Sequence, residues 1–272
     1  FEAFQKLKDR IGPDNIKHFV SIASGPGIDA IGAIEILNPE RVTITDLAPH
    51  AIESAKGNIA RYKKWNVSTP PVEYKVGDLC QPLGDGDADI IYANLPNIPF
   101  HTEDMAELME GINAASFFIP NPQAEIPNNL KAFLLAHQYE FLSQARRCLT
   151  PQSGIAVINL GIRFSMDVVG ELFDSIGYKH EVLAFGLKRQ TEARECLPGY
   201  VKHESSDDGV EFDYYPSIDA QKLTESHPVT SVDELKALLE PIKISARKAL
   251  DLAKSGIEIC HVVATIGAKP LN

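Results

Sequence analysis

The chain has 272 residues, of which 44% are hydrophobic and 23% are charged. At about 150 residues per domain, this length predicts two units or one large domain with an insertion, and it suffices to bury a core without disulfides or metal ions. Asp and Glu number 37 against 26 Lys and Arg, giving a net charge of −11. Because an acidic surface repels a phosphate backbone, we expect a small-molecule substrate and no nucleic-acid partner.

The sequence also argues against a membrane protein and against a metal centre. No stretch reaches the roughly 18 uninterrupted apolar residues of a membrane helix, and the first residues do not resemble a signal peptide. The four cysteines (Cys80, Cys148, Cys196 and Cys260) lie far apart, with no C-x-x-C pair. This pattern indicates reduced thiols in a cytoplasmic protein, with no membrane partner and no bound metal.

Short apolar runs alternate with segments of helical periodicity along most of the chain. In chain order we expect a strand at His18–Gly25, a helix at Ile28–Leu37, a strand at Arg41–Leu47, a helix at Pro49–Lys64, strands at Val72–Leu79 and Ala88–Leu95, a helix at Asn129–Leu149 capped by Asn129, a strand at Gly154–Gly161, a helix at Ser165–Ile176, and strands at His180–Leu187 and Ile257–Ile266. This alternation predicts a doubly wound α/β fold, whose mainly parallel sheet is covered on both faces.

The same pattern divides the chain into three parts. Residues 1–17 form a helical segment and a candidate lid, and residues 18–189 with 256–272 form a Rossmann-like domain. Residues 190–255 interrupt the alternation between the sixth and seventh strands, so we interpret them as an insertion that forms a lid or a substrate-side wall. The insertion begins with polar sequence, and then a capping box from Ser231 to Glu234 predicts a helix that Pro241 interrupts.

Three strand ends carry the residue types of a nucleotide site. The first strand runs into Ser24-Gly25-Pro26-Gly27, where glycines allow close backbone approach to a ligand, although a simple tight turn has the same sequence. Asp46 ends the next strand 21 residues after Gly25, which suits a carboxylate that accepts hydrogen bonds from both ribose hydroxyls. An acid stabilised at a helix start is the alternative for Asp46.

The third strand adds Asp78 and Leu79, an acid and a backbone N–H that can read an adenine edge, or else a turn. NAD is compatible with these three strand ends, although its glycine fingerprint is incomplete. The fourth strand ends in Asn94-Leu95-Pro96-Asn97-Ile98-Pro99-Phe100. Together the four strand ends resemble class I S-adenosylmethionine-dependent methyltransferases, in particular the amino-methyltransferases with an Asn-Pro-Pro-Tyr signature. The resemblance covers roughly Phe19 to Arg189 and the last strand.

The resemblance implies a seven-stranded sheet of six parallel strands and an antiparallel last strand, with S-adenosylmethionine as cofactor. It also implies a role for each matching position. Gly25 and Gly27 would pass the methionine end of the cofactor, Asp46 would hold its ribose, Asp78 and Leu79 its adenine, and Asn94 would face the reacting centre, with Ser24 and Leu47 as further cofactor-binding residues.

Two positions depart from the family pattern. An acid that usually orients the cofactor ammonium group is replaced by Ala23, for which Asp29 is a candidate substitute, although a first-turn helix acid is the alternative. The aromatic ring that closes the signature is replaced by Asn97, which we treat as a candidate catalytic residue. Phe100 is a candidate substrate-binding ring, or else a loop anchor.

Other polar and aromatic residues are weaker candidates. Tyr139 lies opposite the apolar stripe of its expected helix, so its hydroxyl either reaches the site as a catalytic group or covers the surface. His101 and His137 are candidate general bases because histidine titrates near neutral pH, or else solvated or core histidines. Tyr214 and Tyr215, beside Asp213, would enclose a cationic substrate if exposed, or else form the core of the insertion.

The expected function is an S-adenosylmethionine-dependent enzyme that transfers a methyl group to a nitrogen or an oxygen of a small molecule. The alternative is cyclisation of S-adenosylmethionine to azetidine-2-carboxylate with release of methylthioadenosine. It draws on Ala23, because an acid beside the attacking amine would favour its charged form, and on Asn97 and Tyr139, which would hold the bent chain. A non-catalytic binding module on the same fold is a third hypothesis.

Overall fold

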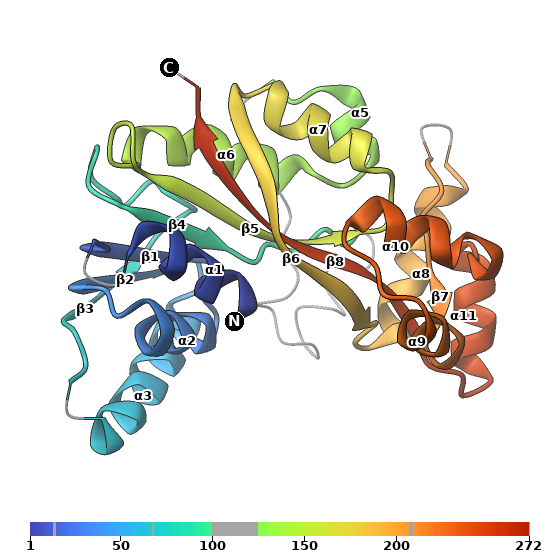
Figure 1. Cartoon of the computed structure of the whole chain (residues 1–272), viewed down its shortest axis with the longest axis horizontal. Coiled ribbons are helices and arrows are strands. Elements are labelled where there is room, and N and C mark those ends of the chain that lie inside the picture. Colours follow the sequence, from blue (N-terminus) through green and yellow to red (C-terminus); the bar gives the residue numbers. More distant parts are fainter. Residues whose placement is uncertain (13–14, 67, 100–124, 207–208, 272) are drawn as a thin grey trace.

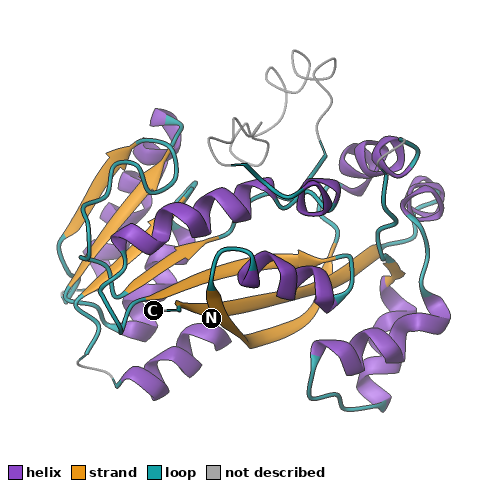
Figure 2. Cartoon of the chain, turned by 90° about the horizontal axis from the view of Figure 1, so that it is seen from above, coloured by secondary structure: helices purple, strands orange, loops and turns teal. Residues whose placement is uncertain are grey.

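A single mixed sheet runs through the chain, with helices on both of its faces (Figures 1 and 2). The computed structural model describes residues 1–12, 15–66, 68–99, 125–206 and 209–271. The strands are β1 (His18–Ile22), β2 (Arg41–Asp46), β3 (Val72–Val76), β4 (Ile90–Ala93), β5 (Ile155–Ile162), β6 (Tyr178–Arg189), β7 (Tyr215–Pro216) and β8 (Ile259–Pro270). The helices are α1 (Glu2–Ile11), α2 (Ile28–Leu37), α3 (Pro49–Trp65), α5 (Asn128–Ala132), α6 (Ala136–Cys148), α7 (Met166–Asp174), α8 (Ala193–Glu204), α9 (Ser217–Ser226), α10 (Val232–Leu239) and α11 (Ala246–Lys254), with a 3-10 helix, η2 (Glu240–Ile242).

The strand order is β3-β2-β1-β4-β5-β8-β6. Neighbours from β3 to β5 pair in parallel, whereas β8 pairs antiparallel with both β5 and β6. This confirms the predicted doubly wound sheet with six parallel strands and an antiparallel last strand, to which the two-residue β7 adds a short antiparallel pairing with β8. The chain reverses its direction of growth between β1 and β4, the place where such sheets bind ligands.

Two apolar clusters hold the helical layers to the sheet. The first joins α1, α2 and α3 to one face, where the buried Phe4 of α1 packs edge-on against Phe19 and Tyr92. The second joins α6 and α7 to the other face and extends into α8 and α11. Because α1 buries Ala3, Phe4 and Leu7, it belongs to the helical layer, and its role as a lid stays a prediction.

The helix expected from Asn129 to Leu149 is two helices. Leu134 adopts φ +62, and the N–H of Leu135 donates to the carbonyl of Leu130, so α5 ends and α6 begins at Ala136. The prediction that Asn129 caps this helix is wrong, because α5 begins after Pro127. Apolar residues keep their helical spacing across the break, so the sequence pattern carries no sign that the helix is interrupted there.

The insertion holds more helix than its polar start indicated. The helices α8 to α11 gather at one end of the sheet (Figure 1). The predicted capping box is confirmed, since Ser231 Oγ accepts the N–H of Glu234, and η2 begins beside Pro241. The sequence hid α8 because Pro198 and Gly199 lie inside it, a dipeptide that normally marks a turn.

Gly199 brings α8 against the loop after β4. A Cβ at this position would lie 2.9 Å from the carbonyl oxygen of Pro99. We expect Gly199→Ala to lower the free energy of unfolding by about 1–3 kcal/mol despite the better helix propensity of alanine, because a backbone carbonyl must move. Gly170→Ala in α7 is the matched control, since its Cβ would meet nothing within 4 Å. It should stabilise the protein by up to about 1 kcal/mol. Urea unfolding measures both, and an equal gain in the two variants would contradict this packing.

Candidate active site

A cavity of about 550 Å³ opens at the carboxyl ends of β1, β4 and β5. Its walls come from the glycine turn, from the loop after β4, from the ends of β5, β6 and β8, and from the first residues of the insertion. The residues that line it are Ala23, Ser24, Gly25, Pro26, Ile28, Asp29, Asn94, Leu95, Pro96, Asn97, Ile98, Asn159, Gly161, Arg163, Lys188, Gln190, Thr191, Glu192, Cys196, His261 and Val263. The structure thus brings together Ser24, Gly25, Asn94 and Asn97 from the sequence prediction.

The turn after β1 depends on glycine. Gly25 and Gly27 adopt φ +50 and +77, a left-handed conformation that glycine adopts without strain. At Gly27 a Cβ would also lie 3.1 Å from the Cβ of Ala55 in α3. Ser24 fixes the turn from the other side, because its N–H donates to Thr45 and its hydroxyl bonds that of Ser21 at 2.9 Å.

Asp46 ties this turn to the end of β2. Its Oδ2 accepts the N–H of Gly25 at 2.9 Å, and its Oδ1 accepts the N–H of Ala48 at 2.9 Å. The carboxylate is 7% exposed, and each of its oxygens retains acceptor capacity for a ligand hydroxyl. Asp46 itself lies beside the cavity rather than in its wall.

Large apolar side chains are exposed at the start of α2, after β2 and at the end of β3. Ile28 begins α2, Leu47 follows Asp46 and Val76 pairs with Asp46, and they are 51%, 45% and 52% exposed. Asp78 and Leu79 follow β3 in the same region, and burial, with the nearby charge of Glu140, raises the pKa of Asp78. An apolar surface beside a fixed carboxylate suits a nucleoside, with its base on the apolar side chains and its sugar on the acid.

The loop after β4 is held by hydrogen bonds to its backbone and side chains. Gln138 of α6 donates to the carbonyl of Leu95 at 3.2 Å, and Tyr200 of α8 donates to the carbonyl of Asn97 at 2.6 Å. Asn94, exposed in the cavity, accepts a hydrogen bond from Asn159 at 3.1 Å. Asn94 is therefore placed to contact a ligand.

Asn97, our candidate catalytic residue, lines the cavity with both ends of its amide hydrogen-bonded inside the protein. Its Nδ2 donates to the carbonyl of Gly161 at 3.1 Å, and its Oδ1 accepts from Arg163 Nη1 at 3.1 Å. Since both ends of the amide are engaged within the protein and the side chain is 8% exposed, its visible role is to position Arg163.

Sequence analysis missed the charged and polar groups at the far end of the cavity. Arg163 follows β5 directly, Lys188 and Gln190 lie at the end of β6, and His261 lies within the apolar run of β8. The available signal was a polar residue at or beyond the end of an apolar strand. Lys188 also lies close enough to Asp29 to oppose the rise in the pKa of Asp29 that burial causes.

The placement of the remaining candidates corrects several expectations. Tyr139 packs partly buried on the core of the α6 face and is not among the described residues that line the cavity, whereas Gln138, one residue earlier, reaches the loop after β4. Phe100 and His101 lie outside the described residues. His137 is buried in α6 rather than placed in the cavity wall.

Tyr214 and Tyr215 are fully buried, which confirms the alternative that they form the core of the insertion rather than exposed rings around a cationic substrate. They pack in the core that joins the insertion to β8, and Asp213 pairs with Lys236 at 2.5 Å. Tyr214 nevertheless contacts a cation, because the Arg163 guanidinium lies 5.7 Å from its ring centroid.

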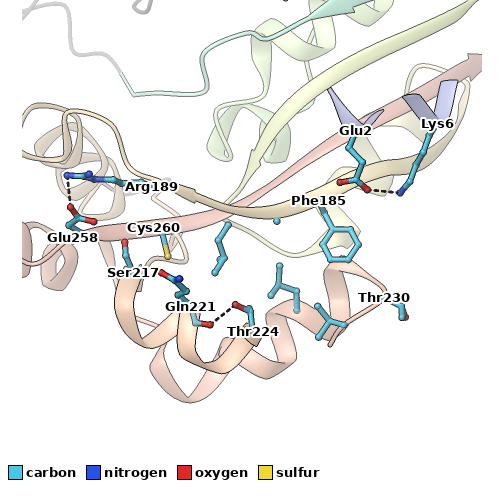
Figure 3. A pocket seen from close by; sticks show the side chains of 14 residues that line it. Glu2, Lys6, Phe185, Arg189, Ser217, Gln221, Thr224, Thr230, Glu258 and Cys260 are labelled. Carbon is cyan, nitrogen blue, oxygen red and sulfur yellow. Dashed lines mark hydrogen bonds and ion pairs between the residues drawn. The ribbon is translucent and has the colours of Figure 1, made fainter. Parts of the chain in front are cut away.

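A second cavity, of about 830 Å³, lies on the other face of β6 and β8 (Figure 3). Side chains alternate along a strand, so Phe185, Leu187 and Arg189 face this cavity while Lys188 and Gln190 face the first. Its walls carry the internal ion pairs Glu2–Lys6 and Arg189–Glu258 and none of the motif residues. We therefore place the candidate active site in the first cavity.

In the described part of the chain, no group of three or more His, Cys, Asp or Glu side chains is arranged to hold a metal ion. The four cysteines are free and buried. No helix among the described residues is long and apolar enough to cross a bilayer.

The buried His137 predicts a pH dependence of stability. Burial lowers its pKa in the folded protein to about 4, below the unfolded value of 6.5. Between these values the unfolded chain binds a proton that the folded chain does not, so its contribution, roughly 3 kcal/mol, is present above pH 6.5 and is lost as the pH falls toward 4. We expect His137→Gln to flatten the unfolding free energy over this range, as measured by urea unfolding at several pH values. The exposed His50→Gln is the control, and parallel curves for wild type and His137→Gln would contradict the prediction.

No protein-family model and no curated protein sequence matches this chain. Solved structures do resemble it. The YcgJ protein of Bacillus subtilis shares 11% identity over 99% of each chain with a TM-score of 0.51. A putative methyltransferase of Bacillus halodurans shares 13% identity over 98% of this chain and 99% of its own, with a TM-score of 0.48. A putative sarcosine dimethylglycine methyltransferase of Galdieria sulphuraria shares 10% identity over 98% of this chain and 84% of its own, with a TM-score of 0.46.

At these identities the likeness concerns the fold alone. The parallel strands and the antiparallel β8 agree with what the sequence resemblance implied. This mixed α/β, Rossmann-like fold, mostly parallel with an antiparallel β8, is the fold expected from the resemblance to class I S-adenosylmethionine-dependent methyltransferases.

Proposed function

We propose that this protein binds S-adenosylmethionine and transfers its methyl group to a nitrogen or an oxygen of a small molecule. The observation that carries the proposal is the carboxylate of Asp46, which is fixed at the end of β2 by the N–H groups of Gly25 and Ala48. Two oxygens with remaining acceptor capacity suit the paired hydroxyls of a ribose. Asp46 lies next to the exposed Leu47 in the chain and pairs with the exposed Val76, and the Gly25 that it binds lines the cavity.

The described residues fit the three parts of this cofactor. Ile28, Leu47 and Val76 offer apolar surface for an adenine ring, which would remove them from water. At the methionine end, Gly25 of the turn lines the cavity without a side chain, which leaves room for the ligand. Asp29 is the carboxylate of α2 that lines the cavity, and it would hold an ammonium group where the family acid is replaced by Ala23.

The bound cofactor supplies a methyl group activated by its positively charged sulfur. The share of the protein in such a displacement is mainly to align the acceptor and to exclude water. Asn94 is the residue placed to orient the acceptor, since it is exposed in the cavity and its amide is steadied by Asn159, whose Oδ1 in turn accepts from Thr265 at 3.3 Å. Thr191, Glu192 and Cys196 of the insertion complete the wall around it.

Cyclisation of the cofactor is the second candidate, favoured by Ala23 in the cavity wall. In that reaction the neutral α-amine attacks the γ-carbon, a nitrogen–carbon bond forms, the carbon–sulfur bond breaks and sulfur keeps the electron pair. The nitrogen then loses a proton. A carboxylate against the amine would favour its protonated form, and the alanine removes that carboxylate from the usual position. Methyl transfer remains our first proposal because Asn94 is left available for an acceptor.

Asp46 tests the cofactor site. We expect Asp46→Ala to weaken binding of S-adenosylmethionine on the order of 10-fold to 100-fold, because a charged acceptor for hydroxyl donors is lost. Asp85→Ala, at an exposed acid paired with Arg147, is the control for charge. Calorimetric titration with S-adenosylmethionine and with NAD measures the effect in folded protein. Unchanged affinity would remove the ribose assignment, and tight binding of NAD with none of S-adenosylmethionine would overturn the cofactor proposal.

The nucleoside product separates the two reactions. We expect the protein incubated with S-adenosylmethionine alone to leave it unreacted, and to release S-adenosylhomocysteine once a nucleophilic acceptor is added. Asn94→Ala should lower that turnover on the order of 100-fold, since a misplaced acceptor costs about this much, with little change in cofactor affinity. Mass spectrometry identifies the product. Methylthioadenosine above the spontaneous background in the absence of any acceptor would favour cyclisation instead.

A further inference from the structure

A buried guanidinium forms part of the cavity wall. Arg163 is 4% exposed and lines the cavity directly after β5. Its position depends on Gly161, because a Cβ there would collide with Nη1 of Arg163. The ring centroids of Tyr200 and Tyr214, both from the insertion, lie 5.2 and 5.7 Å from the guanidinium carbon. Arg163 is therefore held inside the protein by surrounding residues and does not lie on its surface.

The groups that accept hydrogen bonds from Arg163 are neutral. They are Asn97 Oδ1 at 3.1 Å, Gln190 Oε1 at 2.9 Å and His261 Nε2 at 3.0 Å. Burial, together with the charges of Arg163 and Lys188, holds the pKa of His261 well below its usual range, so its ring accepts as neutral imidazole. Among the residues that the structure describes, no carboxylate lies within ion-pair distance of Arg163.

A buried cation without a counter-ion calls for an anion. Burying an unpaired charge is costly, and a guanidinium presents five N–H donors, of which three are used here. Arg163 Nε is buried and has no hydrogen-bond partner in the structure. An ionised group in the cavity would compensate the charge of the guanidinium that lines it.

The charged side chains of the described cavity wall indicate which kind of anionic ligand the cavity would bind. Arg163 and Lys188 contribute two positive charges, and Asp29 and Glu192 contribute two negative charges. Such a balanced wall suits a zwitterion, with its carboxylate on Arg163 and its ammonium on an acid, better than a phosphate dianion.

We propose that Arg163 binds the carboxylate of an α-amino acid group in the reacting small molecule. This inference rests on the proposed function and specifies its substrate class. The carboxylate has two sources that the same chemistry would recognise. One is the amino acid end of S-adenosylmethionine itself, and the other is a separate amino acid acceptor.

Binding measurements with and without the carboxylate test the cofactor source. Wild type is titrated with S-adenosylmethionine, its decarboxylated analogue and methylthioadenosine, and the titrations are repeated with Arg163→Gln. If the cofactor is the source, wild type prefers the intact compound on the order of 10-fold to 100-fold, and the variant loses this preference while its affinity for methylthioadenosine is unchanged. Arg189→Gln is the matched control, because it removes a charge from the opposite face of β6, where Arg189 forms an exposed ion pair with Glu258 at 2.8 Å.

A second set tests the acceptor source. The common α-amino acids and their α-amides are screened by thermal shift against wild type, with and without saturating S-adenosylhomocysteine. If the acceptor is the source, one amino acid stabilises wild type, its amide does not, and Arg163→Gln loses the response while binding S-adenosylmethionine as wild type does.

The proposal is overturned if wild type distinguishes neither an amino acid from its amide nor intact from decarboxylated cofactor. It is also overturned if folded Arg163→Gln keeps the distinction that wild type makes. Both ligand comparisons use wild type alone, so together they test the carboxylate site even if Arg163→Gln fails to fold. If no adenosine compound binds, the proposed function fails, whereas an amino acid that binds without nucleoside, and its amide that does not, still supports the carboxylate site.

Discussion

The burial of Arg163 constrains the whole substrate side of this protein. A guanidinium removed from water needs acceptors on several sides, and here they come from parts of the chain that are far apart in sequence. Asn97 reaches it from the loop after β4, Gln190 from the end of β6, and His261 from β8. Arg163 therefore contacts the sheet, the loop after β4 and the insertion at the same time.

That linkage explains residues that otherwise break local rules. Gly161 interrupts an apolar strand because a side chain there would collide with Arg163. Gly199 lies within α8, where it lowers helix propensity, because its backbone approaches Pro99 and the next residue, Tyr200, donates to Asn97. These positions have a poor local propensity for their strand or helix, and the contacts that they allow hold the loop after β4 in place.

The two halves of the candidate site differ in how they are built. The cofactor half is local, since Asp46 fixes the glycine turn through neighbouring parallel strands and short backbone contacts. The substrate half depends on long-range contacts through β8, which pairs antiparallel between β5 and β6 and so carries His261 to Arg163. Alternation along β6 and β8 then separates this polar cavity from the second cavity on the other face.

The sequence by itself determined the succession of strands and helices in the Rossmann-like domain and the glycine–Asp46 end of the site, but neither the break between α5 and α6 nor the helix α8. These features have short-range signals: apolar runs, caps and turn residues follow one another in the chain, and α2 occupies the predicted residues Ile28–Leu37. Only the tertiary structure decided the substrate half. The neutral partners of Arg163, the engaged amide of Asn97 and the burial of Tyr214 depend on which segments meet across the fold, and a single sequence carries no signal for contacts between residues 27 to 98 positions apart.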